Sequence, residues 1–67
     1  MDGFERRREL KKKDILEAAL ELFMKYGVQK VSIAEIAKEA NVSQVTIYNY
    51  FDSKNNLIHL VFKFYVD

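Results

Sequence analysis

The fold is decided by residues 32–51, which read SIAEIAKEANVSQVTIYNYF. Ser32 and Glu35 have the spacing of a capping box, in which a serine and a glutamate side chain each accept a backbone hydrogen bond at the start of a helix. The apolar residues that follow recur at helical spacing and are expected to point inward: Ile36, Ala37 and Ala40. We therefore predict a short helix over residues 33–40.

Residues 41–43 predict a tight turn between two helices. Asn41 tolerates the positive φ that such a turn requires, because its short polar side chain can hydrogen-bond locally. Val42 can fill the core between the two helices. Ser43 is a favoured N-cap, so a second helix is predicted over residues 44–51.

The helix over residues 44–51 has two faces of different character. Ile47 and Phe51 are four residues apart, so they share the face that we expect to pack inward. Two short helices that cross at a small residue, Ala37, and are joined by a turn with an apolar residue match a helix-turn-helix, whose second helix enters the DNA major groove. Similar helix pairs also have purely structural roles, so the motif alone leaves both interpretations open.

The outward side chains of this second helix suit the reading of DNA. Gln44 can form two hydrogen bonds with the N6 and N7 atoms of adenine. Val45 and Thr46 offer methyl groups to the C5 methyl of thymine. Tyr48 and Asn49 can reach backbone phosphates.

A longer helix is predicted before this pair, ending at Gly27. Glycine there fits the left-handed cap that ends a helix without a Cβ penalty. Two starts are compatible with the sequence: a capping box of Asp14 and Glu17, or, as we favour, a start before residue 10. The predicted buried stripe of this helix consists of Ile15, Leu16, Ala19, Leu22, Phe23 and Tyr26.

A fourth helix is predicted after Ser53, which caps a segment from Lys54 to Val66 that has hardly a polar face. Eight of the ten residues from 57 to 66 are apolar, and on a helix they cover nearly the whole circumference. Packing against the other helices can bury only one side of it. We therefore expect something else to cover the other side.

The chain is predicted to be all-α. It is expected to form one domain, a three-helix, homeodomain-like bundle with a helix-turn-helix at residues 33–51, plus the start of a fourth, connecting helix at residues 54–66. No stretch alternates apolar and polar residues for long enough to form a strand. A length of 67 residues leaves no room for a second domain.

Composition excludes several classes of function. The absence of cysteine removes disulfide scaffolds, cysteine-containing zinc sites and thiol nucleophiles. No apolar run, including that at residues 60–62, is longer than three residues, which is too short to span a membrane. The first residues lack the apolar region of a signal peptide, so we expect a cytoplasmic protein without membrane contact. The single histidine, His59, and the pair Glu35 and Glu39 form no metal or acid–base set. No enzyme activity, metal or cofactor is therefore expected.

Positive charge is concentrated at the N-terminal end. Residues 1–13 carry a net charge of +3 and residues 14–67 a net charge of −2. This asymmetry points to a polyanion, and we predict that Arg6, Arg7 and Arg8 contact phosphates or the minor groove. The alternative is a solvated helix start with helical Glu/Lys pairs. The first 13 residues hold six of the eleven basic side chains: Arg6, Arg7, Arg8, Lys11, Lys12 and Lys13.

The run from Ile15 to Leu57 carries a specific combination of motifs. They are Ile15-Leu16, Ala18-Ala19 and Leu22-Phe23, then Gly27, Ser32-Ile33, Ile36-Ala37 and Val42-Ser43, and above all Thr46-Ile47-Tyr48-x-Tyr50-Phe51-x-Ser53-Lys54-x-x-Leu57. With these residues the chain resembles the N-terminal DNA-binding domain of the tetracycline-repressor (TetR) family of bacterial transcriptional regulators. The resemblance implies a repressor that binds double-stranded, palindromic operator DNA as a homodimer. It also implies a small-molecule effector, bound by a larger domain that follows the fourth helix.

The resemblance implies roles for individual residues by their position. Ser32 resembles a helix cap that also donates to a phosphate, and residues 44–46 fall where the family reads bases. Tyr50 can equally fill the core, and Lys54 can be a solvated residue of a first helical turn. The positions where the family grips phosphates hold Tyr48, Asn49, Tyr50 and Lys54.

Three positions depart from the family pattern. Asn41 stands where glycine is usual, and Val45 stands where a small residue is common, so the base preference of the family does not transfer. Asn55 and Asn56 replace acidic residues, which removes the capping-box partner of Ser53. The motif survives all three departures.

Two functions remain open from the sequence. The first is a sequence-specific DNA-binding module of a TetR-like regulator. The second is a homeodomain-like module that binds a protein through the apolar face of the helix at residues 54–66 and uses its basic end only incidentally.

Overall fold

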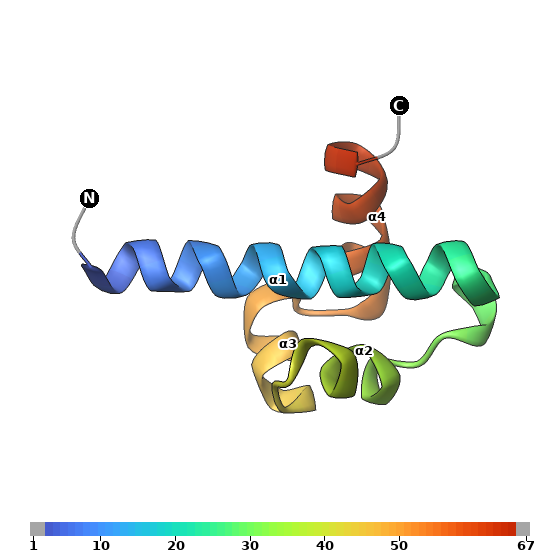
Figure 1. Cartoon of the computed structure of the whole chain (residues 1–67), viewed down its shortest axis with the longest axis horizontal. Helices are drawn as coiled ribbons and strands as arrows, with labels where there is room; N and C mark the ends of the chain where they lie inside the picture. Colours follow the sequence, from blue (N-terminus) through green and yellow to red (C-terminus); the bar gives the residue numbers. More distant parts are fainter. Residues whose placement is uncertain (1–2, 66–67) are drawn as a thin grey trace.

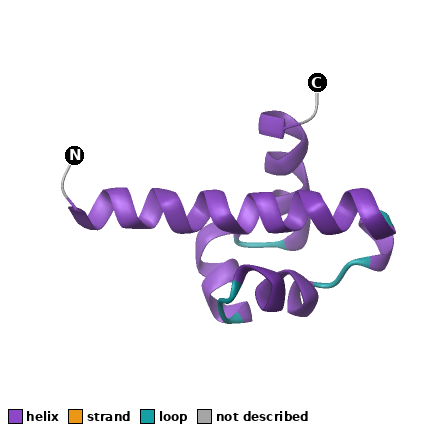
Figure 2. Ribbon diagram, viewed as in Figure 1, coloured by secondary structure: helices purple, strands orange, loops and turns teal. Residues whose placement is uncertain are grey.

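Helices account for almost all of the described chain (Figure 1, Figure 2). The computed structural model describes the backbone of residues 3–65 and the side chains of residues 6–65. The elements are α1 (Gly3–Tyr26), a short 3-10 helix η1 (Val28–Lys30), α2 (Ile33–Ala40), α3 (Gln44–Phe51) and α4 (Lys54–Tyr65). The all-α prediction is confirmed. Val66, which was assigned to the last helix, lies outside the described residues.

The start of α1 confirms the earlier of the two predicted positions. The helix begins at Gly3, so Asp14 and Glu17 lie in its interior and form no capping box. Instead, the Glu17 carboxylate lies 3.9 Å from Lys13 Nζ in an exposed ion pair. The residues before position 14 are mostly arginine, lysine, glutamate and leucine, whose high helix propensity extends α1 in this direction.

The other helices are arranged around α1 (Figure 1). α2 and α3 lie together on one side of α1, whereas α4 crosses α1 and ends on the opposite side. α1 packs against both α2 and α4, α2 packs against α3, and α3 packs against α4. The N-terminal part of α1 projects past the other helices (Figure 1). Its residues Arg6, Arg7 and Arg8 are exposed.

The hydrophobic core joins all four α-helices. The side chains predicted to face inward from the helix-turn-helix are buried, with Ile36 and Phe51 completely inaccessible and Ile47 nearly so. Ala40 and Val42 are half-buried and pack against the same core. Burial of this apolar surface is the main source of stability in so small a domain. The buried cluster consists of Ile15, Leu16, Ala19, Phe23, Val31, Ile33, Ile36, Ala37, Ile47, Phe51, Leu57 and Val61.

Two assignments on α1 are corrected. Tyr26, predicted to be part of the buried stripe, is 58% exposed. It lines a surface pocket with Lys38 and Glu39, because it lies beside the polar side of α2 instead of the core. Ala18, which the predicted stripe left out, is buried, because α2 packs closely enough against α1 to cover a small side chain there.

Gly27 ends α1, as predicted, but its conformation differs from the predicted left-handed helical one. Its φ is 90° and its ψ is 146°, a region that only glycine adopts readily. Its N–H donates to the Phe23 carbonyl at 2.9 Å, and its own carbonyl accepts from the Lys30 N–H at 3.2 Å. A Cβ at this position would meet no neighbouring atom within 4 Å, so the backbone angles and not the available space require glycine.

The turn between α2 and α3 has the predicted chemistry. Asn41 adopts the left-handed conformation, with φ 58° and ψ 47°, and its N–H donates to the Lys38 carbonyl at 3.2 Å. The Val42 N–H donates to the Ala37 carbonyl at 2.9 Å. Both bonds satisfy carbonyl groups that the end of α2 leaves open.

α4 begins with a cap that the sequence predicted in part. Ser53 Oγ accepts a hydrogen bond from the Asn56 N–H at 3.1 Å, which confirms Ser53 as the N-cap. Asn56 also donates from Nδ2 to the Phe51 carbonyl at 2.7 Å, a bond that the acidic residue usual at this position cannot make. Asn56 thus ties the first turn of α4 to the end of α3.

Candidate nucleic-acid interface

The outward face of α3 is exposed as predicted. Gln44 and Asn49 are exposed, Val45 is 68% exposed and Tyr48 is 47% exposed. The opposite face is anchored in the core by the buried Ile47 and its neighbour Phe51, so α3 presents these side chains from a fixed helix. Such an arrangement suits a helix that enters the major groove.

The N-terminus of α3 is closed by side-chain hydrogen bonds. The Thr46 N–H donates to Ser43 Oγ at 3.1 Å, which confirms Ser43 as the N-cap. The hydroxyl groups of Ser43 and Thr46 lie 2.9 Å apart and share a further hydrogen bond. Thr46 is half-buried, so it has less exposed surface to offer a base than Gln44 or Val45.

Ser32 caps α2 through the complete capping box that the sequence predicted. The Glu35 N–H donates to Ser32 Oγ at 3.2 Å, and the Ser32 N–H donates to Glu35 Oε1 at 3.3 Å. The Ser32 hydroxyl also donates to Glu35 Oε1, at 3.1 Å. A phosphate at this helix end would therefore have to replace the Glu35 carboxylate as the acceptor of the Ser32 hydroxyl.

Tyr50 and Lys54 lie at the far end of α3 and at the start of α4. Both are half-buried. The Tyr50 ring packs against the hydrophobic core and makes an edge contact with the Phe51 ring, with centroids 6.4 Å apart. The ring therefore has a core role, while the predicted phosphate contacts of Tyr50 and Lys54 stay predictions.

The basic end of α1 contacts α3 through aromatic rings. The Arg8 guanidinium lies 4.9 Å from the centroid of the Tyr50 ring, and Lys12 Nζ lies 5.9 Å from the centroid of the Phe51 ring. Arg6 and Arg7 are exposed on the same helix. Sequence patterns did not predict the two ring contacts, because each joins residues far apart in the chain.

Other cations of α1 are paired in the manner of a solvated helix. Lys13 and Glu17 form the ion pair described above, and Lys25 Nζ lies 3.2 Å from Glu21 Oε1. The Glu21 carboxylate, which accepts a hydrogen bond from Lys25, raises the pKa of that lysine above its ordinary value. The solvated-helix interpretation therefore holds for these pairs, whereas Arg8 and Lys12 lie against α3.

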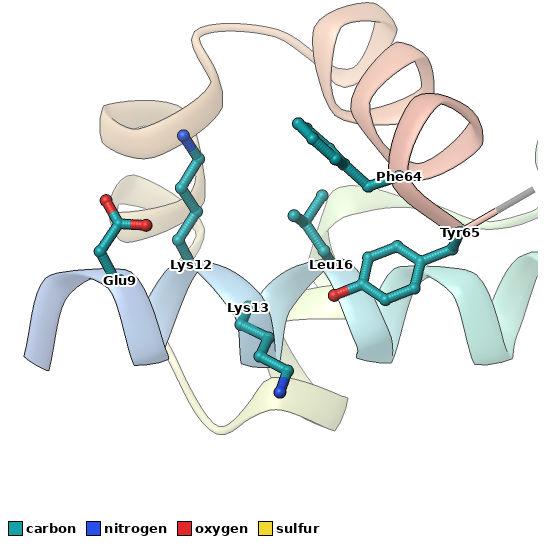
Figure 3. Close-up of a pocket in the computed structure, with 6 residues that line it drawn as sticks. All are labelled: Glu9, Lys12, Lys13, Leu16, Phe64 and Tyr65. Atoms are coloured by element: carbon teal, nitrogen blue, oxygen red, sulfur yellow. The ribbon is translucent and has the colours of Figure 1, made fainter. Parts of the chain in front are cut away.

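A pocket that the sequence did not reveal lies between α1 and the end of α4 (Figure 3). It has a volume of about 390 Å³, and Leu16 faces it from α1 while Phe64 and Tyr65 face it from α4. Polar side chains of α1 form the rest of its lining: Glu9, Lys12 and Lys13. The aromatic residues here belong to the exposed surface of α4, since Phe64 is 63% and Tyr65 37% exposed.

Neither a metal site nor a membrane helix is found in the described part of the chain. No group of three or more histidine, cysteine, aspartate or glutamate side chains among these residues could hold a metal ion. No helix within residues 3–65 is long and apolar enough to cross a membrane.

Residues 15–61 match the sequence model of a family described as bacterial regulatory proteins, tetR family. The chain belongs to the TetR family. Among solved structures, the crystal structure of HlyIIR, a hemolysin II transcriptional regulator, superimposes on this chain with a TM-score of 0.83. The two sequences are 45% identical. That match covers 87% of this TetR-family chain and 32% of HlyIIR.

Curated relatives are also named as regulators. The uncharacterized HTH-type transcriptional regulator YuxN of Bacillus subtilis (strain 168) is 42% identical over 57 residues, which is 85% of this chain and 20% of YuxN. HbdR of Aromatoleum sp. (strain CIB), an HTH-type transcriptional regulator, is 37% identical over 59 residues, covering 88% of this chain and 26% of HbdR. This TetR-family chain thus spans about a fifth to a third of the relatives it matches. It is the helix-turn-helix DNA-binding domain of a TetR-family transcriptional regulator.

Proposed function

We propose that this domain is the sequence-specific DNA-binding module of a ligand-responsive repressor that binds a palindromic operator as a homodimer. The observation that carries the proposal is the exposed face of α3, which the buried Ile47 and Phe51 hold in place. A helix anchored in this way can enter the major groove without rearrangement. One domain contacts one half-site, so a two-fold dimer matches a palindrome.

The proposed division of labour separates base contacts from phosphate contacts. Gln44, Val45 and Thr46 read bases, because they lie at the N-terminal end of the helix that enters the groove. Arg6, Arg7 and Arg8 contact phosphates or the minor groove beside the α3 footprint. The remaining phosphate contacts are assigned to Ser32, Tyr48, Asn49, Tyr50 and Lys54.

The proposed dimerisation and effector binding are assigned to a domain that follows α4. The exposed aromatic side chains of α4 and the pocket against α1 support this assignment, since exposed apolar patches mark interaction surfaces (Figure 3). The chain also spans only a fraction of the relatives that it matches. Effector binding would then change the separation of the two α3 helices by moving α4.

The test compares one base-reading residue with one phosphate-binding residue on an operator selected from random DNA. Gln44→Ala is expected to cost about 1–3 kcal/mol of discrimination at one position of each half-site, because its bidentate contact is lost. Lys54→Ala is expected to weaken binding to all sequences and to reduce the salt slope by about one. Fluorescence anisotropy titrations over a range of salt concentrations measure both quantities.

Two exposed residues of η1 supply matched controls. Gln29→Ala and Lys30→Ala make the same chemical changes away from α3 and are expected to leave affinity and discrimination unchanged. If Gln44→Ala weakens operator and scrambled DNA equally, Gln44 does not read a base. The titration also tests the alternative of a protein-interaction module, which predicts no preference between a palindrome and a scrambled duplex.

A further inference from the structure

Two hydrogen bonds join the end of α3 to the start of α4 at one atom, the Phe51 carbonyl oxygen. It accepts from the Ser53 N–H and from Asn56 Nδ2, each at 2.7 Å. The last carbonyl groups of a helix have no partner within that helix, and each carbonyl oxygen can accept two hydrogen bonds. The Phe51 side chain is completely buried, so the core holds this residue in place. The two bonds therefore tie the first turn of α4 to a fixed point at the end of α3.

The backbone between these two bonds is strained. Asp52 has a φ of 72° and a ψ of −45°, close to the γ-turn conformation that is rare for a residue with a Cβ. A strained conformation of this kind persists only when the surrounding contacts determine it. The Ser53 N–H closes the turn itself, whereas the Asn56 side chain reaches the turn from within α4. Loss of the Asn56 bond is therefore expected to let the turn at Asp52 relax.

A small relaxation of this turn has a large effect at the other end of α3. Gln44 lies about 10 Å along the helix axis from Phe51, at a rise of about 1.5 Å per residue. A rotation of α3 by about 10° about the turn would move Gln44 by about 2 Å. Groups that recognise a ligand have to be held within about 0.5 Å of the productive geometry. The Gln44 end of α3 is thus sensitive to the angle between α3 and α4.

The tie depends on the amide of residue 56. An acidic side chain, which the family pattern has at this position, only accepts hydrogen bonds when it is ionised and could not donate to the Phe51 carbonyl. Asn55 is exposed, and its side chain forms no hydrogen bond with the residues that the structure describes. The two adjacent asparagines therefore differ, since only Asn56 links the two helices.

We propose that Asn56 is a positioning residue for DNA recognition: its hydrogen bond to the Phe51 carbonyl sets the direction of α3 relative to α4 and so aligns Gln44 with its base. The inference rests on the proposed function and deepens it, because Gln44 is the residue assigned to a base there. Asn56 acts through α3 and does not itself contact a base.

Asn56→Asp and Asn55→Asp are the matched variants that test this role. Each adds one negative charge to the first turn of α4, with similar attraction to the helix dipole and similar repulsion of DNA phosphates. Only Asn56→Asp removes a donor to the Phe51 carbonyl. Residual dipolar couplings of the backbone amides, measured on the 67-residue chain without DNA, give the angle between α3 and α4. This angle is expected to keep its wild-type value in Asn55→Asp and to shift or become averaged in Asn56→Asp.

Anisotropy titrations compare the selected operator with a duplex changed only at the base pair that Gln44 reads. Asn56→Asp is expected to lose about fivefold or more of this discrimination, because the bidentate contact is misaligned, whereas Asn55→Asp keeps it. In a Gln44→Ala background, Asn56→Asp is expected to cause no further loss at that base pair, because the side chain that it positions is absent. This coupling separates positioning from a general loss of stability.

Asn56→Ala and Asn55→Ala repeat the comparison without a change in charge, which keeps the test decisive should Asn56→Asp unfold. Thermal unfolding followed by circular dichroism checks each variant. The proposal is overturned if Asn56→Asp lowers the melting temperature but leaves the helix angle and the discrimination as they are in Asn55→Asp, since Asn56 is then a structural residue only. A wild-type chain that selects no operator would instead overturn the proposed function, and the role of Asn56 in recognition with it.

Discussion

α2 and α3 have the same length of eight residues and both begin after a serine N-cap, yet the fold uses them differently. α2 buries Ile33, Ile36 and Ala37 between α1 and α3. α3 buries only Ile47 and Phe51 and leaves most of its other side chains exposed. Both helices also leave four side chains exposed, but those of α2 are mainly charged, whereas those of α3 are uncharged: Gln44, Val45, Tyr48 and Asn49. Equal local signals can therefore give two helices exposed faces of different chemistry.

The two helices also end differently. α2 ends at Asn41 in the left-handed conformation, which asparagine adopts at little cost. α3 ends at Asp52, whose φ of 72° and ψ of −45° fall in a region that is unfavourable for any residue with a Cβ. The Ser53 N–H donates to the Phe51 carbonyl at 2.7 Å across this residue, so the chain turns sharply between α3 and α4. The backbone strain lies on the side of α3 that leads to Lys54.

The largest expected effect is the loss of stability when a buried side chain of α2 is truncated. Ile36→Ala is expected to lower the free energy of unfolding by about 2–5 kcal/mol, because Ile36 is completely buried and its truncation leaves a cavity. Val45→Ala on the exposed face of α3 is expected to change it by less than about 0.5 kcal/mol. Urea unfolding followed by far-UV circular dichroism measures both values.

Ile36→Val provides a milder version should Ile36→Ala fail to fold, with an expected loss of about 0.5–1.5 kcal/mol. An equal loss for Val45→Ala and Ile36→Ala would contradict the division between a supporting and an exposed helix.

A smaller loss of stability is expected when the serine N-cap of α2 or of α3 is removed. Comparing the two losses tests whether the two helix starts are equivalent. Ser32→Ala and Ser43→Ala are each expected to cost about 1 kcal/mol, because each removes the acceptor for a backbone N–H in the first turn. Glu35→Gln is the control, since glutamine also serves in a capping box and should leave stability nearly unchanged. Thermal unfolding measures these differences. A loss confined to Ser32→Ala would mean that the helices differ in their starts as well as in their faces.

The smallest effect concerns the two helix ends. Asp52→Gly is expected to raise stability by up to about 1 kcal/mol, because relief of backbone strain exceeds the extra freedom of glycine in the unfolded chain. Asn41→Gly is expected to change stability by only about a few tenths of a kcal/mol, since asparagine already tolerates its angles. The melting temperature of Asp52→Gly should rise by up to roughly 7 °C. A fall in its melting temperature would show that the Asp52 side chain contributes more than the strain costs.

Much of the interface was predictable because it depends on local chemistry. The three serine caps, the turn at Asn41 and the exposure of Gln44 and Val45 all follow from residues within about one helical turn of one another. The start of α1 was predictable from its helix-forming composition for the same reason. The assigned DNA contacts themselves remain predictions.

The misplaced residues depend on how the helices cross. Tyr26 has the right spacing for the buried stripe of α1, but α2 places polar side chains beside it. Ala18 lies at the edge of the predicted stripe of α1, and it is buried because α2 lies against α1. Helical spacing predicts which residues share a face, but it does not say how far a partner helix covers that face.

The sequence by itself determined the helices, their caps and the outward side chains of α3, because these follow from hydrogen bonds and periodicity over a few residues. Only the tertiary structure decided that Arg8 lies on the Tyr50 ring and that α4 forms a pocket with Leu16. Each of these contacts joins residues that are distant in the chain, and their distance in space is set by the angles at which α1 crosses its neighbours.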